Sequence, residues 1–151
     1  MGVASQIGTS LGAYLKAQVQ NSIILTGIYM IAFAITGVPW WALTGLFCGL
    51  VSLVPTVGGL IALAVGLYAK WMVTDDWMQI GYVGAAWLVI QVVDGFVLSP
   101  RAAGHAGVNP LLSIFLTLGA GLIFGPIGVL LAVPVVAVGL IIMRATRRPV
   151  S

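Results

Sequence analysis

Charged side chains are scarce in this sequence: Asp, Glu, Lys and Arg make up 6% of its 151 residues, whereas hydrophobic residues make up 61%. Soluble domains carry about 25% charged residues. Since so little charge cannot cover a soluble domain with a hydrated surface, we expect an integral membrane protein. The net charge of +3 does not indicate nucleic-acid binding, because the basic residues do not gather on one polar face.

Reactive side chains are scarce as well. Cys48 is the single cysteine, which excludes an internal disulfide and a multi-cysteine metal site. With one histidine, three aspartates and no hydrolase, metalloprotease or phosphate-loop motif, we expect neither an enzyme nor a cofactor. The N-terminus lacks the pattern of a signal peptide, so the hydrophobic segments themselves are expected to direct insertion.

What the sequence does contain is a series of apolar segments. An amphipathic or partly helical lead-in at residues 1–18 precedes a predicted transmembrane module at 19–148. The predicted segments of this module are 21–37, 40–54, 58–70, 78–98, 111–125 and 127–143. A membrane-spanning helix needs about 20 apolar residues, which 78–98 supplies and 21–37 approaches. The loop between Lys70 and Trp77 holds Asp75, Asp76 and two tryptophans, a composition typical of the membrane interface.

Residues 40–69 carry no charge, but Pro55 to Gly59 interrupts them. Each arm of about 14 residues would make about 21 Å of helix, against a hydrocarbon core of about 30 Å. This favours a re-entrant hairpin with its tip at residues 54–58. Two short, tilted spans are the alternative.

A second broken segment, residues 110–143, repeats this pattern around Gly125-Pro126-Ile127-Gly128. The spacing from Pro39 to Pro55 equals that from Pro110 to Pro126. If both segments are hairpins, they enter from opposite sides and form an inverted repeat, an arrangement that marks binding sites in transporters. The expected fold class is therefore an all-α polytopic membrane protein with broken helices or re-entrant hairpins.

The basic residues predict the orientation. The positive-inside rule places Lys16, Arg101 and the arginines at 144, 147 and 148 in the cytoplasm, with Lys70 outside. Both termini are then cytoplasmic, whichever topology the broken segments adopt. Pairs of glycines four residues apart, such as Gly45 and Gly49, favour close helix packing over substrate contact.

Asp94 is the one carboxylate inside an apolar segment, where an acidic side chain costs about 2.5–3.5 kcal/mol at the centre of a bilayer. Gln91 lies one helical turn earlier on the same face. An intramembrane acid of this kind predicts a functional site, here for transport or ion coupling. The alternative is that headgroup water solvates Asp94, because it lies five residues before the predicted Ser99-Pro100-Arg101 turn.

Several motifs occur in a recognisable order. They are Leu53-Val54-Pro55-Thr56-Val57-Gly58-Gly59, Gln91 to Arg101, Asn109-Pro110-Leu111-Leu112, Gly119 to Gly128 and Ala132-Val133-Pro134. This order resembles the C-terminal half of the autoinducer-2 exporter family of bacterial membrane transporters. The resemblance implies export of a small polar solute across the bacterial inner membrane, and some family members are described as sodium/proton antiporters.

We expect Asp94 and Gln91 to meet the two helix breaks at one site. The candidate lining residues are Pro55, Thr56, Gly58, Gly59, Gly125, Pro126 and Gly128, and the candidate loop or gate residues are Pro100, Arg101, Asn109 and Pro110. The expected partners are the lipid bilayer and a small polar solute or cation. Homo-oligomerisation would bury more area for a module with so few spans.

The sequence departs from the family pattern in two ways. The acid in the Gln-x-x-acidic motif is usually Glu, whereas Asp94 is one methylene shorter. Family members are also about twice this length, and their segments before Leu15 have no counterpart here. A truncated, non-transporting membrane scaffold is therefore the rival reading.

Overall fold

The computed structural model describes residues 2–54, 57–101, 111, 115–116, 118–125, 128, 135–136, 138–139 and 142. The helices are α1 (Val3–Ile35), α2 (Trp41–Val51), α3 (Val57–Trp71) and α4 (Trp77–Val93), and α4 continues into a π-helical turn, η1 (Asp94–Leu98). All regular structure in these described ranges is helical, which confirms the predicted all-α class. Two helices, Ala4–Ile35 and Trp77–Arg101, are long and apolar enough to cross a bilayer.

The chain forms two compact units, Val19–Leu98 and a second that combines Met1–Gln18 with Ser99–Ser151. Helix α1 belongs to both, because it runs without interruption through the lead-in and the first apolar segment. It ends at Ile35, ahead of a turn in which Gly37 takes a φ of 67°. Glycine adopts such a left-handed conformation without steric cost.

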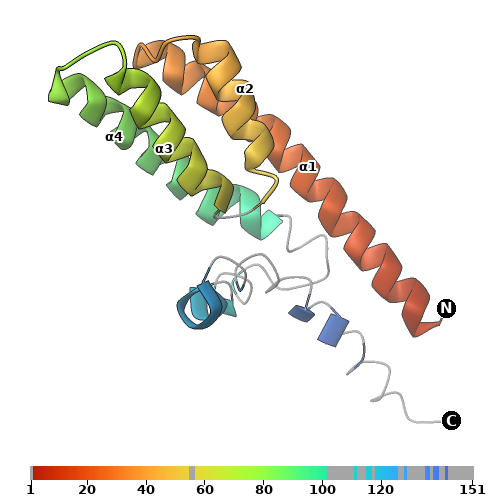
Figure 1. Cartoon of the computed structure of the whole chain (residues 1–151). Coiled ribbons are helices and arrows are strands. Elements are labelled where there is room, and N and C mark those ends of the chain that lie inside the picture. The colour runs from red at the N-terminus through yellow and green to blue at the C-terminus, as the bar shows by residue number, and fades with distance from the viewer. Residues whose placement is uncertain are drawn as a thin grey trace, which may run out of the picture. The chain divides into compact units, whose positions relative to one another are not determined.

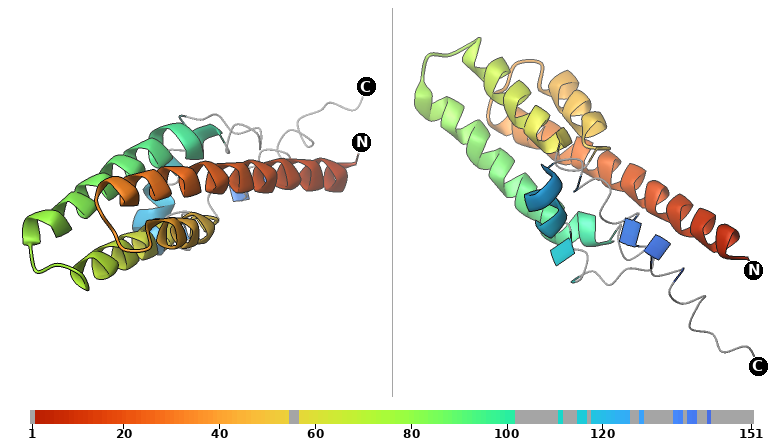
Figure 2. Two further views of the ribbon diagram at one scale, coloured as in Figure 1. Left: turned by 90° about the horizontal axis from the view of Figure 1, so that it is seen from above. Right: turned by 60° about the horizontal axis from the view of Figure 1, so that its bottom comes forward.

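Within Val19–Leu98, α2 and α3 form an antiparallel hairpin (Figure 1), and α3 packs between α2 and α4. Figure 2 shows this bundle from two further directions. Helix α2 has 11 residues and α3 has 15, so their lengths are about 17 and 22 Å at 1.5 Å per residue. Neither helix alone reaches across a hydrocarbon core of about 30 Å.

Glycines on α2 allow α1 and α2 to lie close together. A Cβ at Gly45 would lie 2.7 Å from the Cα and N of Met30, and one at Gly49 would overlap Thr26. The Ser22 hydroxyl also donates to the carbonyl of Gly49 at 2.6 Å. The predicted packing role of Gly45 and Gly49 is confirmed, since a larger residue at either position would force the helices apart.

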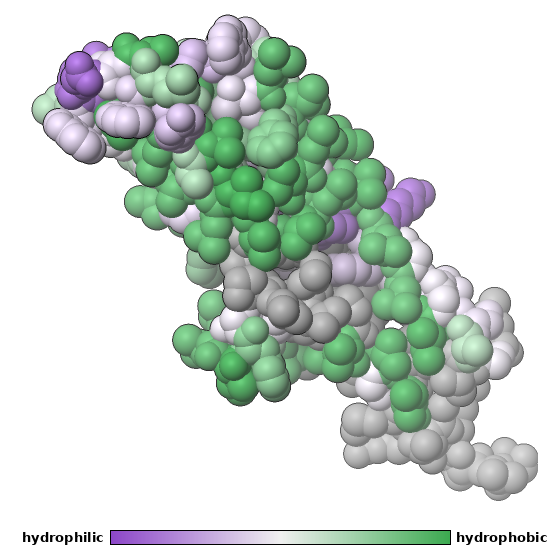
Figure 3. Space-filling view, viewed as in Figure 1, coloured by the Kyte–Doolittle hydropathy of each residue, from purple (hydrophilic) through white to green (hydrophobic). Residues whose placement is uncertain are grey.

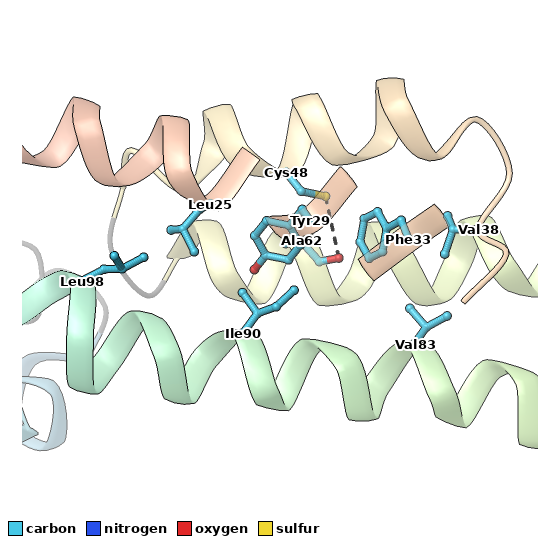
Figure 4. Packing of buried hydrophobic residues seen from close by; sticks show 9 residues of the cluster. All are labelled: Leu25, Tyr29, Phe33, Val38, Cys48, Ala62, Val83, Ile90 and Leu98. Atoms are coloured by element: carbon cyan, nitrogen blue, oxygen red, sulfur yellow. Dashed lines mark hydrogen bonds between the residues drawn. The ribbon is translucent and has the colours of Figure 1, made fainter. Parts of the chain in front are cut away.

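The core of this unit gathers side chains from all four helices (Figure 4). Leu25, Tyr29 and Phe33 come from α1, Cys48 from α2, Ala62 from α3, and Val83 and Ile90 from α4. The outer face is apolar too: Figure 3 shows hydrophobic residues along the helices and hydrophilic residues at the end that holds the α3–α4 loop. Large apolar residues of these helices, such as Phe47, Leu60 and Leu88, are exposed. A surface of this kind faces lipid.

Candidate functional site

Asp94 begins the π-helical turn, a local structure that sequence analysis did not predict. Such turns are rare and occur often at functional sites. Pro100 gives a physical reason for it, because a proline in a regular helix clashes with the carbonyl four residues earlier, here that of Phe96. A wider turn moves this carbonyl away, and Gly95 adds no side chain that could resist the change.

The predicted turn at Ser99-Pro100-Arg101 is wrong, since these residues are helical and extend the long helix to Arg101. The widened turn explains how the helix passes the proline. Pro100 is buried and Arg101 is exposed, and their suggested role as a gate stays a prediction.

Asn21 of α1 holds the end of the π turn. Its side-chain amide donates to the carbonyl of Leu98 at 2.8 Å, and the residue is 6% exposed. An unpaired buried carbonyl costs about 1–3 kcal/mol, so this bond stabilises the irregular backbone that carries Asp94.

Helix α4 contacts the start of α3 at Gly59. The Trp87 indole N–H donates to the carbonyl of Gly59 at 2.7 Å. One turn later, the Gln91 carboxamide lies directly against Gly59. A Cβ at Gly59 would be only 2.6 Å from Gln91 Nε2. The structure thus brings Gln91 to the first helix break, and the absence of a side chain at Gly59 makes room for it.

Tyr29 of α1 contacts α4 as well, and its side chain is only 1% exposed. Its hydroxyl donates to Gln91 Oε1 at 3.4 Å and has the Ser52 hydroxyl as a second hydrogen-bond partner. Ser52 follows α2 directly, and its hydroxyl also donates to the carbonyl of Cys48 at 2.7 Å. We call Tyr29, Ser52, Gln91 and Asp94 the polar cluster; the first two are buried and the last two are half-buried.

Sequence analysis missed Tyr29 and Ser52. A signal was present in the first apolar segment, where Asn21, Leu25, Tyr29 and Phe33 recur every four residues and share one face of α1. All four are buried. Tyr29 was read as part of an apolar run, and only the fold reveals what its hydroxyl meets.

The remaining predicted site residues divide into three groups. Gly58 is buried, and a Cβ there would overlap the carbonyl of Val51. In the other unit, residues 118–125 are helical and Gly125 has a φ of 65°, while a Cβ at Gly128 would overlap the carbonyl of Ala120. Pro55, Thr56, Asn109, Pro110 and Pro126 lie outside the described residues.

A comparison with protein families identifies the chain. Residues 2–148 match the model of the AI-2E family transporter. The chain belongs to the AI-2E transporter family. The match extends over almost the whole sequence, so the family resemblance drawn from the motifs is confirmed.

Individual relatives agree with the AI-2E assignment. The chain is 28% identical over 137 residues to YueF of Bacillus subtilis (strain 168), a transport protein by provisional name, and 28% identical over 138 residues to the AI-2 transport protein TqsA of Escherichia coli (strain K12). These alignments cover 90% and 91% of this chain but 37% and 40% of the relatives. The chain therefore spans about two fifths of the length of these relatives. No solved structure matches it.

Proposed function

We propose that this chain forms a transport module of the bacterial inner membrane, which moves a small polar solute out of the cell with proton or cation coupling at Asp94. The observation that carries the proposal is the polar cluster, in which Gln91 contacts the α2–α3 hairpin at Gly59. The name of TqsA makes autoinducer-2 the first solute to test.

The chemistry of the cluster supports coupling. A carboxylate can exchange a proton for a cation, and the Gln91 amide, one helical turn before Asp94, offers a neutral oxygen as a partner. Broken helices are the usual place for such sites in transporters, because their ends leave backbone groups near the centre of the membrane. Asp94 stands at an irregular turn of this type.

The lengths of α2 and α3 support a re-entrant hairpin in place of two spans. Each is shorter than the hydrocarbon core, and the two pack directly against each other. We place both termini in the cytoplasm from the positive-inside rule.

A sodium/proton antiporter is the second candidate function. The same cluster favours it, because Asp94 could alternate between a proton and a sodium ion without any other solute. A non-transporting scaffold is the remaining alternative, and it would give no role to an acid inside an apolar segment.

An Asp94→Asn variant tests the proposal. The chain is reconstituted in lipid vesicles, and autoinducer-2 movement is followed under imposed pH and sodium gradients. Loss of the only acid in the apolar segments should reduce gradient-driven transport to the level of protein-free vesicles. Solute-free proton movement driven by sodium would favour the antiporter.

Asp75→Asn is the matched control, because Asp75 is an exposed aspartate in the α3–α4 loop. It should transport like the parent chain. Equal transport by the parent and Asp94→Asn would refute a coupling role for Asp94, and absence of transport by the parent under every gradient would support the scaffold.

A further inference from the structure

We propose that Gln91 is a specificity-determining residue, whose side-chain amide nitrogen donates hydrogen bonds to an acceptor oxygen of an uncharged solute, a hydroxyl or carbonyl oxygen. The proposal rests on the function proposed above and deepens it. It names the group that contacts the solute and the chemical class of solute that this group can bind.

The carbonyl side of the Gln91 amide is held by α1. The Tyr29 hydroxyl donates to Gln91 Oε1 at 3.4 Å, and Figure 4 shows this hydroxyl pointing from α1 towards α4. Tyr29 is 1% exposed, so water has little access to the bond. Because Oε1 and Nε2 belong to one rigid amide group, a fixed oxygen also fixes the direction of the nitrogen.

The end of the same amide lies against Gly59 on α3. A Cβ at Gly59 would be 2.6 Å from Nε2 and 2.8 Å from Oε1, but 3.0 Å from Cδ of Gln91. Since both terminal atoms are nearer than Cδ, the amide points end-on towards the start of α3. Trp87 holds this part of α3, because its indole N–H donates to the Gly59 carbonyl at 2.7 Å. Gln91 is therefore directed at the first helix break.

The nitrogen of this amide has unused hydrogen-bonding capacity. Among the described residues, Gln91 makes one hydrogen bond, which Oε1 accepts, so the two N–H groups of Nε2 have no acceptor there. Neighbouring donors differ, because each has a backbone carbonyl as acceptor: Asn21 that of Leu98, Ser22 that of Gly49 and Trp87 that of Gly59. A donor left without a partner in an apolar segment is costly, which points to a ligand as its partner.

This donor is also accessible. In the described part of the chain, every fully buried side-chain nitrogen and oxygen has a hydrogen-bond partner. Nε2 of Gln91 lacks such a partner and must therefore keep some exposed surface, which agrees with the half-buried state of the residue. A solute can reach it without any rearrangement of the helices.

An N–H donor restricts the chemistry of its ligand. It binds an oxygen with a free lone pair and cannot bind a metal cation, which needs a lone pair itself. An anionic solute would meet repulsion from Asp94, one helical turn away on the same face. An uncharged solute with hydroxyl or carbonyl oxygens fits best. Oε1 keeps its second lone pair, so this role is compatible with a cation partner at Asp94.

Equilibrium binding of autoinducer-2 to the full chain in detergent, measured by calorimetry, tests the assignment. Gln91→Ala should raise the Kd about fivefold, the effect of one net hydrogen bond. Gln79→Ala is the matched control, because Gln79 is an exposed glutamine on the same helix, and it should bind like the parent.

Gly59→Ala tests the position of the amide without removing it. The three atoms nearest to the added Cβ all belong to the flexible end of Gln91, so the amide moves while the backbones stay packed. This variant should raise the Kd by a similar factor. Combined with Gln91→Ala it should add nothing further, because the amide that it displaces is then absent.

A parent-like Kd in Gln91→Ala would overturn the proposal, as would absence of autoinducer-2 binding by the parent. Fully additive effects of Gly59→Ala and Gln91→Ala would overturn it too, as would a Gln91→Ala variant that loses sodium binding alone. If Gln91→Ala does not fold, Gly59→Ala decides in its place. The proposed transport function fails by a different observation, equal transport by the parent and Asp94→Asn in vesicles.

Discussion

The environment of Lys70 in the structure differs from the one that its neighbours in the sequence predict. Its position next to Trp71, Asp75 and Asp76 predicted an interfacial loop residue. The structure extends α3 to Trp71, and Lys70 is 6% exposed with its ammonium donating to the carbonyl of Gly37 at 3.1 Å. The lysine thus closes the turn that follows α1.

Lys70→Met should therefore lower the free energy of unfolding by about 1 kcal/mol, because the Gly37 carbonyl loses its charged donor and gains only partial replacement by water. Thermal unfolding in detergent, followed by tryptophan fluorescence, measures the change. Lys16→Met is the control, since Lys16 is exposed on α1 and should tolerate the change. Equal losses in the two variants would show that the Gly37 bond contributes nothing specific.

Single residues also show where prediction from sequence stops. Asp94 and Gln91 stand out because polar groups are costly in an apolar segment. Tyr29 does not stand out, because an aromatic ring is ordinary in such a segment and its hydroxyl matters only through distant partners such as Gln91. Gln91 is 62 positions away from Tyr29 in the sequence.

At the scale of elements, the α1–α2 contact depends on glycine. Gly45→Ala should lower the free energy of unfolding by about 1–3 kcal/mol, the usual cost of overpacking, because its Cβ would meet the backbone of Met30 at 2.7 Å. Gly27→Ala is the matched control on α1, where no atom lies within 4 Å of the added Cβ. Alanine favours a helix over glycine by about 1 kcal/mol, so the control should be neutral or stabilised. A stable Gly45→Ala protein would mean that the helices can separate at little cost.

The elements were predictable to different degrees. Apolar length predicts the two long helices, and the proline-glycine break predicts the division between α2 and α3. The π turn has no such signal, because Gly95 and Pro100 are equally compatible with the end of a helix. Its formation depends on Asn21, which supplies the donor for the Leu98 carbonyl from a distant helix.

At the scale of the whole molecule, the arrangement in the membrane is the main prediction. Single cysteines are placed at Asp75, Ala103, Thr56 and Ile127 in a Cys48→Ala background, and intact cells are treated with bulky impermeant or small permeant thiol reagents. The positive-inside rule predicts reaction of Asp75→Cys from outside and Ala103→Cys from inside. Two hairpin tips within the membrane would make Thr56→Cys and Ile127→Cys resist bulky reagents from both sides and react with small ones.

Ordinary membrane spans in place of hairpins predict a different labelling pattern. If α2 and α3 each crossed the membrane, bulky reagents would label Thr56→Cys from inside, and a second pair of spans would expose Ile127→Cys outside. Helices of 11 and 15 residues would then have to thin the bilayer by many ångströms, at fractions of a kcal/mol for each ångström. A re-entrant hairpin would avoid this mismatch and would leave the polar cluster next to a backbone break, where the proposed coupling site would gain most from unpaired backbone groups.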